Sequence, residues 1–174
     1  RLLAGPMDYT PGIFDLRFPE HSTVSQVNTT LAKQLAFYVV IYSPLQMAAD
    51  LPENYVDQPG FQFIRDVPCD WETTVSLDGE IGEFAVIARQ DRASRDWYLG
   101  AITGYEARSL AVPLSFLEPG VTYTATLYAD GEGAHWDEDP FPLSITTLTL
   151  TAADVLPLEL APGGGAAVRF TPIP

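Results

Sequence analysis

The β-strand pattern of this chain is clearest in the stretch Val121-Thr122-Tyr123-Thr124-Ala125-Thr126-Leu127-Tyr128-Ala129, where an apolar side chain occupies every odd-numbered position. Successive side chains of a strand point to opposite faces of a sheet, so this alternation predicts a strand with one face on a core. The three residues before it, Glu118-Pro119-Gly120, are typical of a turn. The stretch therefore predicts a strand that begins after a turn in an antiparallel sheet.

The same alternation recurs through the second half of the chain. It predicts strands near residues 73–78, 84–88, 97–103, 110–116, 121–129, 143–150, 155–160 and 167–170. The pair Asp78-Gly79 predicts a hairpin turn after the first of these strands. About eight short strands, with turn signals roughly every 8–12 residues, are typical of an antiparallel β-sandwich.

The first third of the chain has helical periodicity instead. Apolar residues recur at helical spacing from Leu31 to Tyr42, and Asn28-Thr29-Thr30 supply an N-cap before them. Pro44 ends this helix, because the residue before a proline is pushed out of the α region. The pattern also predicts a second short helix over Leu45–Leu51, which ends at Pro52.

A last helical turn is expected around residues 61–65, with Phe61 and Ile64 pointing inward. Before all of these segments, Leu2–Met7 reads as a short apolar strand that leads into a turn at Thr10-Pro11-Gly12. A strand, a turn and then a helix are typical of the last βα step of a barrel. Because the chain opens directly on this strand without an initiator Met, we expect it to belong to a longer protein.

The expected fold is therefore mostly β. It is an antiparallel β-sandwich of about eight strands, preceded by the last βα unit of a (β/α)8 barrel. The composition changes after Pro68, which places a boundary near residues 60–70. We accordingly predict two parts, residues 1–66 as the end of a barrel and residues 67–174 as the β-sandwich.

Charge and composition exclude several classes of function. The chain has 23 acidic and 9 basic residues, for a net charge of −14. Nucleic acids and anionic membranes attract basic surfaces, so neither is an expected partner. No apolar run reaches the roughly 18–20 residues that a membrane-spanning helix needs. The one cysteine, Cys69, cannot form an intrachain disulfide and is expected to be half-buried.

The best candidates for a substrate pocket are Asp8 and Tyr9, at the end of the expected barrel strand. Active sites of such barrels lie at the carboxyl ends of the strands, so both could line or support a pocket. Cleavage of a glycoside needs two positioned carboxylates, and one acid alone cannot do it. Asp8 could equally accept hydrogen bonds from the turn that follows it, and Tyr9 could be a packing residue. The sequence has no histidine-based triad or zinc motif.

A dense acidic loop spans Asp130 to Asp139. Carboxylate oxygens are the ligands that calcium prefers, although the spacing differs from that of an EF-hand loop. An acidic hairpin tip can also simply be solvated. Within the loop, Trp136 could stack on a sugar, as in carbohydrate-binding modules, or could fill a hydrophobic gap at the end of the sheet.

Several segments resemble glycoside hydrolase family 97. They are Leu3–Gly12, Thr30–Ala36, Tyr42–Tyr55, Phe61–Pro68, Asp70–Thr73 and Tyr98–Thr103, so the resemblance covers essentially the whole chain. It implies an exo-acting α-glycosidase, chiefly an α-glucosidase or α-galactosidase, that is periplasmic or secreted in bacteria. The family plan is an N-terminal β-sandwich, a (β/α)8 barrel and a C-terminal all-β domain linked to oligomerisation.

The resemblance also implies acidic catalytic residues and a calcium ion near the substrate. In the family these residues lie upstream of the segment that matches Gly5–Tyr9, so we assign no catalytic residue and no metal ligand to this chain. The chain would then be an inactive scaffold and oligomerisation part, and the assembly it implies is a homodimer. Its partners would be the missing N-terminal part and the oligosaccharide substrate of the parent enzyme.

The alternative is a free-standing, non-catalytic carbohydrate-binding β module. The apolar helix expected over Leu31–Tyr42 favours the first hypothesis, because such a module has no reason to carry a barrel strand and its helix. The choice between glucose and galactose, and between retention and inversion, stays open at this stage.

Overall fold

The structure is a computed structural model that describes residues 9–22 and 24–174. Its strands, all paired antiparallel, are β1 (Trp71–Glu80), β2 (Phe84–Asp91), β3 (Trp97–Thr103), β4 (Arg108–Pro113), β5 (Thr122–Asp130), β6 (Leu143–Thr151), β7 (Val155–Leu160) and β8 (Gly165–Pro172). The prediction of a mostly β, eight-stranded antiparallel fold is therefore confirmed for the described residues. The expected barrel strand Leu2–Met7 lies outside them.

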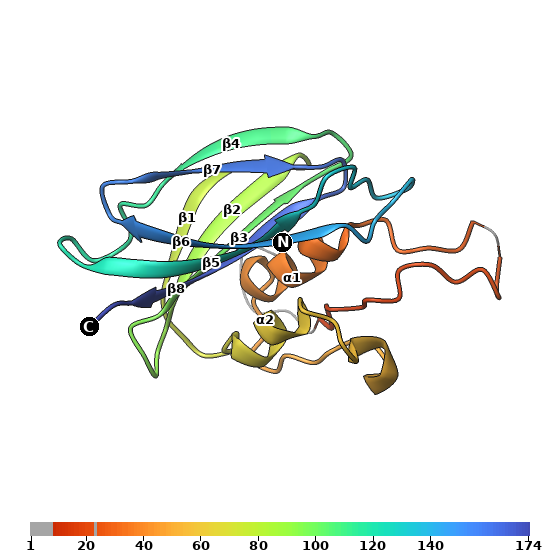
Figure 1. Cartoon of the computed structure of the whole chain (residues 1–174), viewed down its shortest axis with the longest axis horizontal. Helices are drawn as coiled ribbons and strands as arrows, with labels where there is room; N and C mark the ends of the chain where they lie inside the picture. Colours follow the sequence, from red (N-terminus) through yellow and green to blue (C-terminus); the bar gives the residue numbers. More distant parts are fainter. Residues whose placement is uncertain (1–8, 23) are drawn as a thin grey trace.

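The eight strands divide unequally between two sheets. One sheet has six strands in the order β1-β2-β3-β8-β5-β6, and the other has only β4 and β7. Figure 1 shows the two-stranded sheet on one side of the larger sheet and the helices on the other. Because β8 lies between β3 and β5, the last strand of the chain occupies the centre of the larger sheet.

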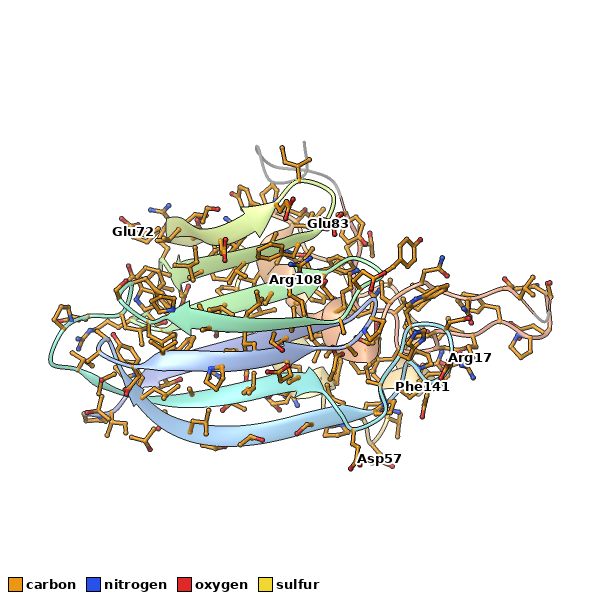
Figure 2. All side chains as sticks on the ribbon, turned by 90° about the horizontal axis from the view of Figure 1, so that it is seen from above. Arg17, Asp57, Glu72, Glu83, Arg108 and Phe141 are labelled. Carbon is orange, nitrogen blue, oxygen red and sulfur yellow. The ribbon has the colours of Figure 1, made fainter. Side chains whose placement is uncertain are left out.

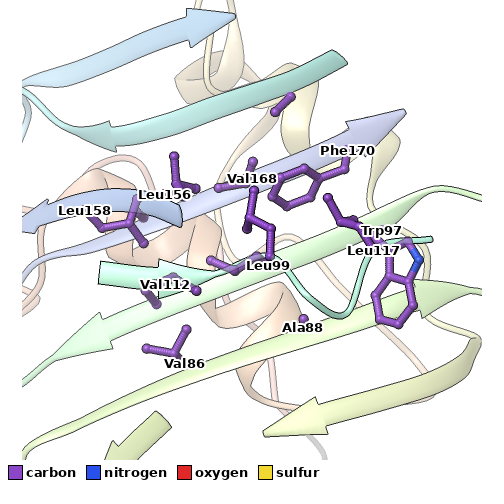
Figure 3. Packing of buried hydrophobic residues seen from close by; sticks show 14 of the residues in the cluster. Val86, Ala88, Trp97, Leu99, Val112, Leu117, Leu156, Leu158, Val168 and Phe170 are labelled. Carbon is purple, nitrogen blue, oxygen red and sulfur yellow. The ribbon is translucent and has the colours of Figure 1, made fainter. Parts of the chain in front are cut away.

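Apolar side chains fill the space between the two sheets. Trp97 and Leu99 of β3 and Phe170 of β8 meet Val112 of β4 and Leu158 of β7 there (Figure 3). All five side chains are almost fully buried. Burial on this scale is the main term that stabilises such a fold, at roughly 25 cal/mol for each Å² of apolar surface.

The opposite face of the six-stranded sheet is covered by helix α1 (Leu31–Val40) and helix α2 (Phe61–Asp66), with a 3₁₀ turn η1 (Pro52–Tyr55) between them. Thr30 is the N-cap of α1 and its side chain accepts a hydrogen bond from the Lys33 amide at 3.3 Å, which confirms the predicted cap. Every residue of α1 except Lys33 is buried. This apolar helix is therefore held by packing on all sides. No helix in the described residues is long and apolar enough to cross a membrane.

A second core lies between these helices and the sheet. Leu35 and Tyr38 of α1 and Phe63 of α2 share it with Tyr98 of β3 and Tyr128 of β5. Residues on both sides of the expected boundary thus pack in one core. The division into residues 1–66 and 67–174 stays a prediction.

The second expected helix, Leu45–Leu51, is wrong. This segment is extended, and its backbone is bonded to other parts of the chain instead. The Ala49 amide donates to the Pro11 carbonyl at 3.0 Å, and the Tyr38 hydroxyl lies 3.0 Å from the Met47 carbonyl. Seven residues between two prolines allow at most about two helical turns. So short a helix is not stable by itself, so the hydrogen bonds to the rest of the chain decide the conformation.

Phe61 and Ile64 of α2 pack against the helix-side core, as expected, and Phe63 between them is the fully buried residue of this helix. Two smaller expectations are corrected. The β1 strand continues through Asp78-Gly79 to Glu80, and the turn comes at residues 81–83, where Gly82 has a φ of +90°. Cys69 is exposed rather than half-buried, since it lies in the connection between α2 and β1.

Candidate functional site

The acidic loop begins with a carboxylate that points inward. Asp130 is the last residue of β5, and its Oδ1 accepts a hydrogen bond from the Thr30 hydroxyl at 2.6 Å. Its Oδ2 accepts from the amides of Ala161 and Gly165, each at 2.9 Å. Burial raises the pKa of Asp130 to about 6, although these hydrogen bonds and the nearby Lys33 oppose the shift. Asp130 therefore ties the start of α1 to the end of the sheet.

The remaining acids of the loop do not converge. The backbone of His135 pairs with that of Asp139, and the Gln26 side chain donates to Asp137 Oδ1 at 2.7 Å. Arg17 donates to the carbonyls of Asp137 and Glu138 and lies over the Phe141 ring, beside which Figure 2 labels it. Among the described residues no three His, Cys, Asp or Glu side chains are grouped to hold a metal ion. Calcium binding by the loop stays an untested alternative.

Trp136 closes the end of the sheet only in part. Its ring is half-buried and lies so close to Gly163 that a Cβ there would sit 2.4 Å from the Trp136 Cβ. Tyr105 packs edge-on against the indole with 5.4 Å between ring centroids, and it stays 66% exposed. Trp136 therefore fills a gap and also contributes to an aromatic surface. A sugar-stacking role for Trp136 stays a prediction.

Of the two expected pocket residues, the structure places one. Asp8 lies outside the described residues. Tyr9 is half-buried and packs edge-on against Phe37 of α1, with 5.7 Å between ring centroids. Ile41, the C-cap residue of α1, and Ile87 of β2 belong to the same small cluster, and burial raises the pKa of Tyr9. Tyr9 thus anchors the first described residues to the helix, and its pocket-lining role stays a prediction.

A hollow lies next to α2. It has a volume of about 390 Å³, opens to solvent, and is lined by Tyr55, Asp57, Gln58, Pro59, Phe61, Gln62 and Arg65. Figure 2 labels Asp57, one of these lining residues. Asp57 is the one carboxylate in this lining. The hollow therefore lacks the two opposed carboxylates that glycoside hydrolysis requires.

Two arginines that link the helices to the sheet were not singled out from the sequence. Arg89 of β2 is 7% exposed, donates from Nε to the Val39 carbonyl at 2.6 Å and from Nη1 to Thr74 at 2.7 Å. It thereby caps the C-terminal end of α1, where a cation is favoured by the helix dipole. Burial lowers its pKa. An arginine directly after the apolar run of residues 84–88 was the signal in the sequence.

The second arginine holds α2 against the sheet. Arg169 of β8 pairs with Asp66, the last residue of α2, at 2.9 Å and with Asp96 at 2.8 Å. The Tyr98 hydroxyl donates to the Asp66 carbonyl at 2.8 Å. These contacts are structural, since the ion pairs are intramolecular and leave no free group aimed into a cavity.

The fold is a mostly β domain with a helical layer on one face of its larger sheet. A family model described as "Glycosyl-hydrolase 97 C-terminal, oligomerisation" matches residues 70–171. The chain belongs to this family, as its resemblance predicted.

Known structures and sequences agree with this assignment. A glycoside hydrolase family 97 enzyme from Pseudoalteromonas sp., solved with acarbose, superposes with a TM-score of 0.93 at 49% identity, over 99% of this chain and 27% of that one. The retaining α-galactosidase of Bacteroides thetaiotaomicron is 37% identical over 98% of this chain and 26% of its own length. A β-arabinopyranosidase superposes with a TM-score of 0.76 at 27% identity, over 95% of this chain and 25% of that one. The chain thus spans about a quarter of the relatives it matches.

Proposed function

We propose that this chain is the C-terminal, oligomerising part of an α-glycoside hydrolase, and that the catalytic carboxylates lie in the remainder of that enzyme. The observation that carries the proposal is the match of nearly the whole chain to about a quarter of a family 97 enzyme. The hollow beside α2 supports it, because its lining contains one carboxylate rather than a pair.

An exposed apolar segment supports docking onto the rest of the enzyme. Leu45, Met47, Leu51 and Val56 are 65%, 44%, 60% and 66% exposed, and they lie in the segment before α2, on both sides of η1. Contiguous apolar surface of this kind marks contact sites in soluble proteins. We propose that the remaining three quarters of the parent enzyme cover it.

For the substrate we favour an α-glucoside over an α-galactoside. A family 97 enzyme that is 49% identical to this chain was solved with panose, whereas the α-galactosidase is 37% identical. Panose consists of α-linked glucose units, so the more similar of these two relatives binds an α-glucoside. The parent enzyme would then hydrolyse panose faster than a galactoside of the same size.

Calcium and an extracytoplasmic location are further proposals for the parent enzyme. The acids of this chain do not form a calcium site among the described residues, so the ion would be held elsewhere in the enzyme. We expect EDTA to abolish hydrolysis by the parent enzyme and added calcium to restore it. We also expect cell fractionation to recover the parent enzyme from the periplasm or the medium.

The test combines a mass with an activity. Mass spectrometry of the natural protein that contains this sequence should give several times the 19.0 kDa of this chain. The chain alone should not release nitrophenol from p-nitrophenyl α-glucoside. If the isolated chain hydrolyses this substrate, and the activity stays with the chain through further purification, the proposed location of the catalytic acids is refuted.

A further inference from the structure

The two edges of the six-stranded sheet differ in how they are protected. Figure 2 shows β1 (yellow-green) and β6 (light blue) at opposite margins of the sheet. The β1 edge carries Glu72, Asp78 and Glu80, and its pairing with β2 is interrupted by two register shifts. Charges and bulges of this kind prevent an edge strand from pairing with another chain.

The β6 edge has none of these protections. Its sequence, Leu143-Ser144-Ile145-Thr146-Thr147-Leu148-Thr149-Leu150-Thr151, contains no charge, proline or glycine. It pairs with β5 over all nine residues without a register shift. Long, uncharged and regular edges are the ones that accept another strand.

Backbone groups of β6 point away from β5 and are available. The Gly131 amide donates to the Pro142 carbonyl, so the N–H and C=O groups of the even-numbered residues of β6 face β5. Thr151 exchanges hydrogen bonds with Asp154 instead, so the odd-numbered positions face outward. By this alternation the N–H and C=O groups of Ile145, Thr147 and Thr149 point outward. In the described part of the chain, β6 has β5 as its one neighbouring strand.

The charge of the whole chain favours a second copy at this edge. With a net charge of −14, two copies repel each other over most of their surfaces. An uncharged strand is where they can approach closely. An antiparallel strand can pair with itself about a twofold axis, and β6 lies within the residues that match the oligomerisation model.

We propose that β6 pairs antiparallel with β6 of a second copy, about a twofold axis through Thr147. Ile145 then lies opposite Thr149 of the partner copy, and about six backbone hydrogen bonds join the sheets of the two copies into one. This inference rests on the proposed function, since it names the surface through which the chain assembles.

The test places charges at the proposed axis. In the full 174-residue chain, Thr147→Lys puts two lysines opposite each other, and Thr147→Asp puts two aspartates there. Each variant alone should dissociate, with a dimer dissociation constant raised at least about tenfold by the facing like charges. An equimolar mixture should dimerise again, because Lys then faces Asp. Light scattering after size-exclusion chromatography measures each state.

Matched controls are Thr73→Lys and Thr73→Asp, at an exposed position of β1. They should leave dimerisation at the wild-type level, and circular dichroism should show that all four variants are folded.

If the Thr147 variants stay dimeric, the chain assembles through another surface, and only the β6 inference fails. If the wild-type chain is monomeric at its highest soluble concentration, both the inference and the oligomerising role proposed for this chain fail. Dissociated variants that do not recover on mixing would refute the twofold register at Thr147.

Discussion

Asp130 shows how one side chain can join elements that are distant in the sequence. Its carboxylate bonds the N-cap of α1, 100 residues earlier, and two amides that follow β7. Gly164 leaves the space this requires, since a Cβ there would lie against the carboxylate. The acidic loop is therefore anchored by its first residue, which is a structural role rather than the metal-binding role that acidic composition suggested.

The buried carboxyl of Asp130 should make stability depend on pH. Its pKa is raised to about 6 from an ordinary 3.8, so the folded chain binds this proton more tightly than the unfolded chain. The resulting stabilisation is complete below about pH 4 and is lost as the pH rises through about 6. Asp130→Asn cannot titrate: its amide oxygen can still accept from the Ala161 and Gly165 amides, and its amide nitrogen can donate to the Thr30 hydroxyl oxygen. Between pH 4 and 7 the Asn variant should gain roughly 1–3 kcal/mol relative to wild type in urea unfolding.

The wild-type and Asn curves share every other titrating group, including Lys33, so their difference isolates Asp130. Parallel curves across this pH range would show that the Asp130 carboxyl has the same pKa in the folded and unfolded chains.

A second residue-scale prediction concerns Arg89. Arg89→Ala removes the donors to Val39 and Thr74 and leaves a cavity beside α1. We expect it to lower the free energy of unfolding by about 2–3 kcal/mol, because buried acceptors lose their partner. The control is Arg95→Ala, which removes an exposed pair with Glu118 and should cost no more than about 0.5 kcal/mol. Equal effects of the two substitutions in guanidinium unfolding would contradict the capping role.

At the scale of elements, the close approach of α1 to the sheet depends on small residues. A Cβ on Gly100 of β3 would lie 2.7 Å from the Ala36 carbonyl oxygen and 2.9 Å from Val40 Cγ2. Ala167 of β8, which pairs with Gly100 in the sheet, is fully buried in the core on the helix side. The helix can therefore lie directly on the backbone of the central strands, and its apolar residues need no larger side chains beneath them.

Gly100→Ala should separate this helix from the sheet. We expect a loss of about 1–3 kcal/mol in unfolding free energy, since the added methyl meets helix backbone that cannot yield easily. Gly104→Ala is the control, because Gly104 follows the same strand and a Cβ there would meet nothing closer than the Glu83 carbonyl oxygen, at 3.3 Å. Thermal melting followed by circular dichroism measures both. A Gly100→Ala protein as stable as the Gly104→Ala protein would show that α1 is not tightly seated.

At the scale of the whole molecule, the uneven layers leave one apolar segment uncovered. The two-stranded sheet and α1 cover opposite faces of the larger sheet, while Leu45, Met47 and Leu51 stay in contact with water. We predict that the triple substitution of these residues by Gln roughly halves the fluorescence of bound anilinonaphthalene sulfonate. Thermal stability should be unchanged, because no core contact is lost.

The matching control is Ile81→Gln, which removes an exposed isoleucine at the isolated β1–β2 turn. It should leave dye binding near the wild-type value. Equal loss of dye binding in the two proteins would mean that single exposed residues, rather than the segment from Leu45 to Leu51, bind the dye.

Much of the fold could be predicted from local patterns. The alternation in residues 121–129 and 155–160 identified β5 and β7, and Thr30 was recognisable as the N-cap of α1, because these signals involve only neighbours in the sequence. Leu45–Leu51 was misassigned because its extended form depends on Pro11 and Tyr38, which are distant in the sequence. Arg89 was missed for the same reason, since its helix-capping role exists only once β2 lies under α1.

The sequence by itself therefore determined the strands, the helix start, the acidic surface and the family, since each is a matter of residue type and local spacing. Only the tertiary structure decided the division into six and two strands, the insertion of β8 between β3 and β5, and the exposure of the β6 edge. The physical reason is that the alternation of apolar and polar residues along a strand tells which side chains face a core. It does not state which strand lies beside which, because that choice is made by packing across the whole chain.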